Sequence, residues 1–129
     1  MTIELRMLGL SILLGFVHII LSANATTRQY GLDWNLGPRD EVQPPPDRMA
    51  GRLQRALRNF GETFPFFAAA VLAAQIAGRN GTLTQIGVQL YFWGRVAYLP
   101  LYAYGVRLVR TVAWTVSLLG IALILLALI

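Results

Sequence analysis

The sequence predicts an all-α integral membrane protein, a single domain over residues 1–129 built as a bundle of four transmembrane helices. Hydrophobic residues make up 56% of the 129 residues and charged residues only 13%, whereas about 25% is usual in soluble domains. Four stretches carry no Asp, Glu, Lys or Arg: residues 7–27, 63–78, 80–94 and 111–129. A spanning helix needs roughly 20 mostly apolar residues. The first and last stretches satisfy this directly, and the middle two do so when Glu62 and Arg95 are included.

The first two helices are expected over residues 3–25 and 47–76. The apolar run of the first is longer than the hydrophobic region of a signal peptide, so it is interpreted as a helix that spans the membrane. The loop between them, residues 26–47, is rich in Gly, Pro and mixed charge, and connections this long are often functional or mobile. Asp47 is expected to cap the second helix, and Pro65 predicts a kink within it.

The remaining two helices are expected over residues 82–104 and 110–129. The short turn at residues 78–81 predicts that the second and third helices are antiparallel neighbours. Arginines indicate the orientation, because cytoplasmic loops are enriched in positive charge. The end with both termini and the second loop holds Arg6 and Arg79, and the opposite end holds the remaining arginines outside the third helix: Arg28, Arg39, Arg48, Arg52, Arg55, Arg58, Arg107 and Arg110. Loops one and three are therefore expected in the cytoplasm and both termini outside.

Composition also limits the possible chemistry. The chain has no cysteine, which excludes disulfides, a thiolate nucleophile and thiolate metal ligands. Its one histidine, His18, is expected to be a packed helix residue, so no metal site is predicted. The net charge of +5 comes from arginine without lysine, which suits carboxylates and phosphates, although a GC-rich genome produces the same bias. Nucleic-acid binding is not expected, because the arginines lie at the ends of membrane helices.

A polar stripe marks the start of the second helix: Arg52, Arg55, Asn59 and Glu62 share one helical face. A carboxylate one turn inside an apolar span is costly without a partner. The stripe is therefore either a ligand site or the polar contact that holds the bundle together.

The third helix carries a second stripe, with Tyr91, Arg95, Tyr98 and Tyr102 on one face. Arg95 lies near the middle of its span and needs a partner, for which Glu62 is the candidate. The fourth helix opens with Arg107, Arg110 and Trp114. A structural alternative applies to the residues near helix ends, because arginine there often reaches the lipid headgroups and Tyr and Trp form an interfacial belt: Arg48, Arg52, Arg107, Tyr104 and Trp93. Asn24 and Arg28 fit either interpretation.

Together these motifs resemble the MAPEG family, the membrane-associated proteins in eicosanoid and glutathione metabolism. The resemblance rests on Arg55-Ala-Leu-Arg58-Asn59-x-x-Glu62-Thr-Phe-Pro65, on Arg95-x-x-Tyr98-x-x-x-Tyr102 and on Arg110-Thr111-x-x-Trp114. It extends over essentially the whole chain in helix number and spacing.

The resemblance implies a homotrimer that holds glutathione between neighbouring subunits near the cytoplasmic face. By position in the motifs, it implies that Arg110 stabilises the glutathione thiolate and that the remaining site residues bind the tripeptide: Arg55, Arg58, Asn59, Glu62, Tyr98, Tyr102 and Thr111. Arg28 matches a basic residue of the first helix by position only. A cation beside a thiol favours the thiolate, which makes the role of Arg110 chemically reasonable. Trp114 departs from the family pattern, since several members have tyrosine there.

The resulting prediction is a glutathione transferase or glutathione-dependent peroxidase that acts on lipophilic electrophiles reaching it from the lipid bilayer. The compact sequence resembles a bacterial member, which implies the bacterial inner membrane. A non-catalytic lipid-binding or scaffold protein of the same fold is the alternative. A small four-helix exporter is a third possibility, but such transporters usually place their essential carboxylate in the first helix rather than the second.

Overall fold

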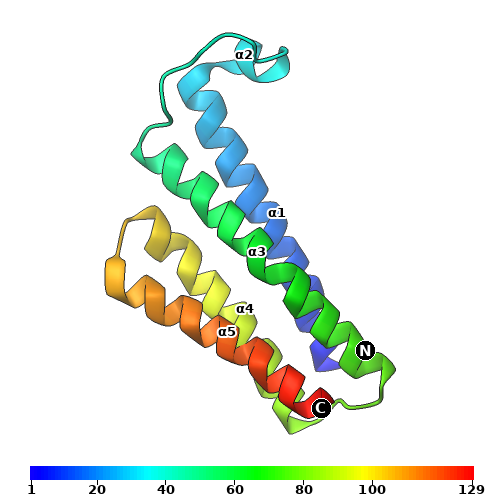
Figure 1. The fold of residues 1–129 in the computed structure, drawn as a ribbon. Coiled ribbons are helices and arrows are strands. Elements are labelled where there is room, and N and C mark those ends of the chain that lie inside the picture. Colours follow the sequence, from blue (N-terminus) through cyan, green and yellow to red (C-terminus); the bar gives the residue numbers. More distant parts are fainter.

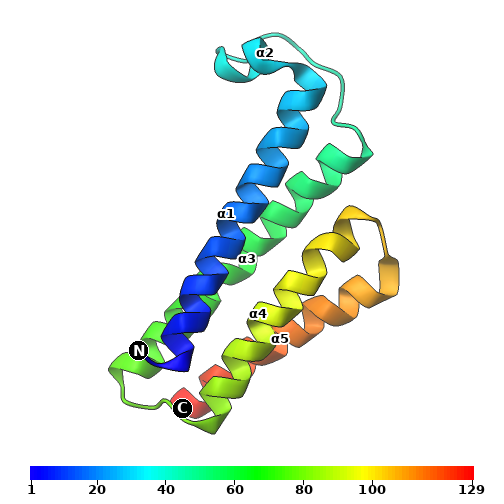
Figure 2. The same ribbon diagram turned by 180° about the vertical axis from the view of Figure 1, so that it is seen from behind.

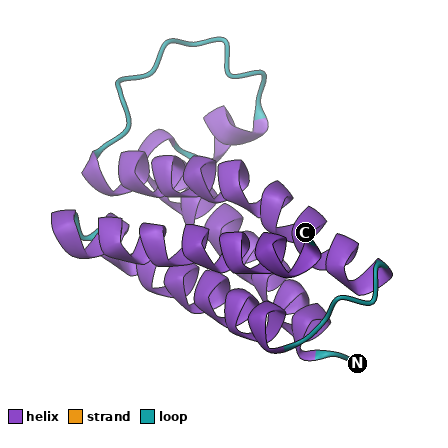
Figure 3. Ribbon diagram, turned by 60° about the horizontal axis from the view of Figure 1, so that its bottom comes forward, coloured by secondary structure: helices purple, strands orange, loops and turns teal.

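The computed structural model describes all residues 1–129, and its regular structure is entirely helical (Figure 3). Four long helices are joined by one short one: α1 (Ile3–Tyr30), α2 (Leu32–Leu36), α3 (Arg48–Ile76), α4 (Thr82–Ala103) and α5 (Arg107–Leu128). The connection between α2 and α3 arches away from the other helices (Figure 3). The all-helical prediction is therefore confirmed.

The long helices form an elongated bundle of two antiparallel pairs, α1 with α3 and α4 with α5 (Figure 1). α4 also contacts α3 and α1, which agrees with the neighbouring positions expected for the second and third long helices. Both termini and the α3–α4 turn lie at one end, and α2 lies at the other (Figure 2). The two ends that differ in arginine content are therefore opposite ends of the bundle.

The helix boundaries follow the predictions at α3 and α4 but differ at α1 and α5. Asp47 caps α3 as expected, since its side chain accepts a hydrogen bond from the Ala50 amide at 2.8 Å. α1 continues to Tyr30 instead of ending near residue 25. The prediction was too short because the last residues of the helix are polar, so the hydrophobic pattern ends before the helix does. Gly31, at φ 91°, then ends the helix. The expected loop over 26–47 thus contains the end of α1 and all of α2.

α5 begins at Arg107, three residues before the expected start, because the turn that precedes it is tight. Gly105 adopts a φ of 74°, and Val106 is already the residue that caps α5. α3 and α4 both continue as helices through their prolines, Pro65 and Pro100. Arg107 and Arg110 therefore lie on consecutive turns of one helix.

The closest helix–helix contact lies between α4 and α5, where Gly87 faces Gly120 and Gly94 faces Ser117. A Cβ atom at Gly87 would lie 2.6 Å from the carbonyl oxygen of Gly120, and one at Gly94 would lie 2.9 Å from that of Ala113. Small residues let backbones approach in this way, and in membranes such packing drives helix association. The α4–α5 pair carries four of the nine predicted site residues, α3 carries another four, and α1 carries Arg28.

Two helices, α1 and α5, are long and apolar enough by composition to cross a membrane. α3 and α4 have comparable lengths but contain charged residues, among them Arg55, Arg58 and Glu62 on α3 and Arg95 on α4. Large hydrophobic side chains are exposed along the bundle, among them Leu13, Phe16 and Ile20 on α1 and Leu126 on α5. Exposed apolar surface on this scale is typical of a protein surrounded by lipid or by partner subunits.

Candidate functional site

The polar stripe on α3 faces α4 and is bonded to it at successive turns. Arg52 donates to the carbonyl oxygen of Ala103, Arg55 Nε donates to the Tyr102 hydroxyl at 3.0 Å, and Arg95 donates to Asn59. One turn deeper, the hydroxyls of Thr63 and Tyr91 lie 3.1 Å apart. Three of the four residues of the stripe thus hold two helices together, and the fourth, Glu62, is exposed.

Arg95 is fully buried, as expected for an arginine in the middle of a span, but its partner is not Glu62. Its Nη1 donates to Asn59 Oδ1 at 2.7 Å. Its guanidinium lies over the ring of Tyr98, 4.4 Å from the centroid, and 5.6 Å from that of Phe60. The prediction of a Glu62–Arg95 ion pair was wrong, because Asn59, one turn before Glu62, faces α4 while Glu62 is rotated toward α5.

A cavity of about 270 Å³ lies where α3, α4 and α5 meet. It is lined by six residues, five of which belong to the predicted site: Asn59, Tyr98, Tyr102, Arg110, Thr111 and Trp114. The Arg110 guanidinium lies 4.6 Å from the centroid of the Tyr102 ring, and the rings of Tyr98 and Tyr102 lie 5.5 Å apart. Residues from three helices are thus brought into one polar cavity with a cation on its wall.

Besides Asn59, two residues at this cavity already have hydrogen-bond partners within the protein. The Tyr102 oxygen accepts from Arg55, which leaves its own hydrogen free to donate. The Thr111 hydroxyl donates to the carbonyl oxygen of Arg107, which leaves its oxygen free to accept. The polar lining is therefore held in place before any ligand arrives.

A second cavity, of about 390 Å³, continues from the first along α3 and α5, and Trp114 lines both. Its lining is mostly apolar and includes Phe66, Leu118, Ile121 and Leu125, with Glu62 and Thr63 also at its wall. A polar cavity and an apolar groove thus lie on either side of one tryptophan. This arrangement suits a polar ligand beside a lipophilic one.

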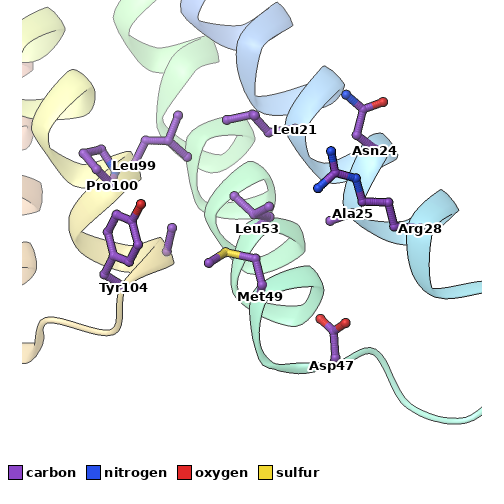
Figure 4. A pocket seen from close by; sticks show the side chains of 11 residues that line it. Leu21, Asn24, Ala25, Arg28, Asp47, Met49, Leu53, Leu99, Pro100 and Tyr104 are labelled. Carbon is purple, nitrogen blue, oxygen red and sulfur yellow. The ribbon is translucent and has the colours of Figure 1, made fainter.

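Two predicted site residues lie apart from the others in the protomer. Arg58 is exposed on α3 and lines neither cavity. Arg28 lines a larger hollow of about 580 Å³ between α1, α3 and α4, where its guanidinium points inward above the Asp47 carboxylate (Figure 4). Asn24 and Tyr104 line the same hollow, which lies on another side of α3 from the Arg110 cavity.

Sequence reasoning did not find a buried polar contact near the terminal end of the bundle. Glu4 is 2% exposed and accepts a hydrogen bond of 2.6 Å from the Thr84 hydroxyl, which joins α1 to α4. Glu4 precedes the charge-free stretch that begins at residue 7, and its spacing of seven residues from Ser11 and fourteen from His18, all three buried, was the available signal. His18 packs against Phe60, with ring centroids 4.9 Å apart, as expected of a packed residue.

These features define the class of protein: a helical membrane protein with an arginine- and tyrosine-lined cavity beside an apolar groove. A sequence model of the MAPEG family matches residues 7–129. The chain therefore belongs to the MAPEG family of integral membrane proteins, most of which are glutathione-dependent enzymes. Neither the curated proteins nor the solved structures contain a significant match to it.

Proposed function

We propose that the protein is a glutathione transferase or glutathione-dependent peroxidase acting on lipophilic electrophiles, with Arg110 as the residue that stabilises the thiolate. The observation that carries this proposal is the cavity where Arg110, Tyr102, Tyr98 and Asn59 come together from three helices. Family membership supplies glutathione as the expected thiol, and because the chain has no cysteine, any thiol nucleophile must come from a bound molecule.

The cavity offers the groups that a small anionic peptide needs. Arg110 supplies positive charge, and Asn59 and the Tyr102 hydroxyl supply hydrogen-bond donors. Arg55, held against Tyr102, adds a second cation at the same edge, 6.0 Å from the centre of that ring. Glu62 at the adjoining groove could accept from the ligand's ammonium group.

The apolar groove beside Trp114 would hold the second substrate. Its walls come from α3 and α5, where large exposed hydrophobic residues such as Phe66 and Leu125 would face lipid, so a lipophilic molecule could enter from the bilayer. The polar end of the groove meets the Arg110 cavity at Trp114. The reacting carbon or peroxide oxygen would therefore lie near the thiol.

The chemistry follows from this placement. Arg110 favours loss of the thiol proton to water, because its charge stabilises the thiolate. In the transferase reaction the sulfur attacks an electrophilic carbon and forms an S–C bond, and the leaving group takes the electron pair. In the peroxidase reaction two glutathione molecules reduce one lipid peroxide to an alcohol and water and become the disulfide.

We further propose a homotrimer in a bacterial inner membrane, with α1, α3, α4 and α5 as the four spans and both termini outside. The position of Arg28 supports assembly, because it lies away from the Arg110 cavity of its own subunit. If Arg28 binds the ligand, it therefore does so at the cavity of a neighbouring subunit. The opposite placement of arginine-rich and arginine-poor ends supports the orientation. Native mass spectrometry in detergent tests the trimer, and labelling of single cysteines at residues 2 and 40 in intact cells tests the orientation.

The central experiment compares Arg110→Ala with Arg107→Ala in detergent-purified protein. Arg107 lies one turn earlier on the same helix and is exposed outside the cavity, so its loss is the matched control. We expect Arg110→Ala to abolish the thiolate absorbance of bound glutathione and to lower kcat by about 100-fold or more. Arg107→Ala should leave both unchanged.

Three other results would refute the proposal. Wild-type protein that does not bind glutathione, but co-purifies with lipid, would establish the non-catalytic lipid-binding alternative. Binding without turnover on any lipophilic electrophile or peroxide would establish a scaffold. Equal loss of activity in the Arg107 and Arg110 variants would remove the special role of Arg110.

A further inference from the structure

Arg95 has a single hydrogen-bond acceptor in the structure, the Oδ1 atom of Asn59. Its side chain is 0% exposed, and its Nε and Nη2 atoms are buried without a partner. The Tyr98 and Phe60 rings cover the guanidinium but offer no acceptor in its plane. Asn59 is therefore the one group that satisfies this buried cation.

This contact determines which end of the Asn59 amide faces the cavity. An amide can normally be turned by 180°, since its oxygen and nitrogen are similar in size. Arginine carries donors only, so it can face the oxygen of Asn59 but not the NH₂ group. Because Asn59 also lines the Arg110 cavity, its Nδ2 remains the end available to a ligand there.

We propose that Arg95 is a positioning residue that fixes Asn59 as a hydrogen-bond donor toward the ligand. Asn59 then recognises a carboxylate or carbonyl oxygen and rejects an ammonium group. This inference rests on the proposed function for the identity of the ligand, glutathione. Arg95 itself does not touch the ligand, and the ligand atom that lies against Asn59 is a hydrogen-bond acceptor.

The surrounding groups agree with this assignment. The Tyr102 oxygen already accepts from Arg55, so its hydroxyl also presents a donor, and Arg110 presents only donors. The one carboxylate nearby, Glu62, lines the adjoining groove instead. Apart from the Thr111 oxygen, which is free to accept, these groups present donors to acceptor atoms of the ligand, and the ligand's ammonium group is directed toward Glu62.

The first test exchanges Asn59 for Asp and for Leu, which are close to it in size, and measures glutathione affinity by calorimetry. Asp keeps an acceptor for Arg95 but presents an oxygen to the ligand, whereas Leu presents nothing. We expect Asn59→Leu to bind about tenfold more weakly than wild type, and Asn59→Asp to bind at least threefold more weakly still. If Asn59→Asp binds as tightly as wild type or more tightly, Asn59 faces the ammonium group and the proposal is overturned.

The second test examines Arg95 itself with Arg95→Lys and Arg95→Met. Lys retains a donor for Asn59 Oδ1, so glutathione KM should stay within about threefold of wild type. Met leaves the amide free to rotate, so KM for glutathione should rise at least fivefold while kcat and KM for the electrophile change less than twofold. A merely structural role would change all three constants together, and that result would overturn the proposal.

A ligand-free measurement separates this proposal from the proposed function. Thermal unfolding should show Asn59→Asp at least as stable as wild type, because a carboxylate still satisfies Arg95, and Asn59→Leu clearly less stable. If wild type does not bind glutathione but this order holds, the function is wrong while the positioning of Asn59 stands. If Asn59→Leu is as stable as Asn59→Asp, Arg95 does not hold Asn59 and the positioning is wrong.

Discussion

Replacing Gly87 with alanine tests whether close contact between α4 and α5 holds the bundle together. The added methyl group would lie 2.6 Å from the Gly120 carbonyl oxygen and 2.7 Å from Cγ1 of Ile124, whereas ordinary contact begins at 3.4 Å. The nearer obstacle is backbone, so it cannot rotate away. The two helices must therefore move apart by most of an ångström.

The expected cost follows from overpacking at a site that cannot relax. Inserting a methylene or methyl group into a packed interior typically costs about 1–3 kcal/mol. The higher helix propensity of alanine returns about 0.5–1 kcal/mol. Separation also removes contacts of the neighbouring Gly120, which approaches the Gly87 carbonyl oxygen from the other side. We expect a net loss of about 1–2 kcal/mol in the free energy of unfolding.

Reversible unfolding in mixed detergent micelles, followed by circular dichroism, measures this loss. Gly9→Ala is the matched control, because a Cβ at this exposed helical position meets nothing within 4 Å. It should be neutral or slightly stabilising. If the free energy of unfolding of Gly87→Ala lies within about 0.5 kcal/mol of the wild-type value, a margin typical of surface substitutions, the close α4–α5 contact does not exist as described.

Three further substitutions test individual contacts. Thr84→Val removes the donor that satisfies buried Glu4, so the free energy of unfolding should fall by about 1–3 kcal/mol. Thr84→Ser keeps the hydroxyl and should retain the stability of the wild type. Equal stability of the two variants would disprove the contact. Asp47→Ala removes the cap of α3 and should lower the free energy of unfolding by about 1 kcal/mol, whereas Asp47→Ser should lower it little. An unchanged melting temperature for the alanine variant would show that the cap does not stabilise α3. Trp114→Ala opens the wall shared by the two cavities and should raise KM for a lipophilic electrophile several-fold, with little change in KM for glutathione. A rise in KM for glutathione alone would show that the electrophile does not bind in the groove beside Trp114.

The polar stripe on α3 shows how far sequence reasoning could go at the site. Its helical spacing correctly placed Arg55 and Asn59 on one face, and the stripe of α4 likewise placed Tyr98 and Tyr102 together. Spacing could not decide whether the stripe bound a ligand or joined helices. The structure shows that Arg55 and Asn59 are bonded to α4, so they join the helices; Asn59 also lines the cavity, and Arg55 contacts it only through Tyr102. Ligand binding by the stripe stays a prediction.

The partner of Arg95 was assigned incorrectly for a specific physical reason. From the sequence, the charge of Glu62 made it the natural counterion for a buried guanidinium. The direction in which each side chain points depends on how α3 is rotated against α4 and α5. Asn59 and Glu62, three residues apart, point about 60° apart around the helix, which is enough for them to face different neighbours. That rotation is set by packing, which the pattern along one helix does not contain.

The amino-acid sequence by itself determined the helical fold, the four long helices and the family, because hydrophobic length, helical spacing and motif residues are local properties of the chain. Only the tertiary structure decided that Asn59 rather than Glu62 meets Arg95, that Arg28 and Arg58 lie outside the Arg110 cavity, and that Glu4 is buried against Thr84. These outcomes depend on the rotation and separation of packed helices. Close contacts such as Gly87 against Gly120 set both, and they join residues far apart in the sequence.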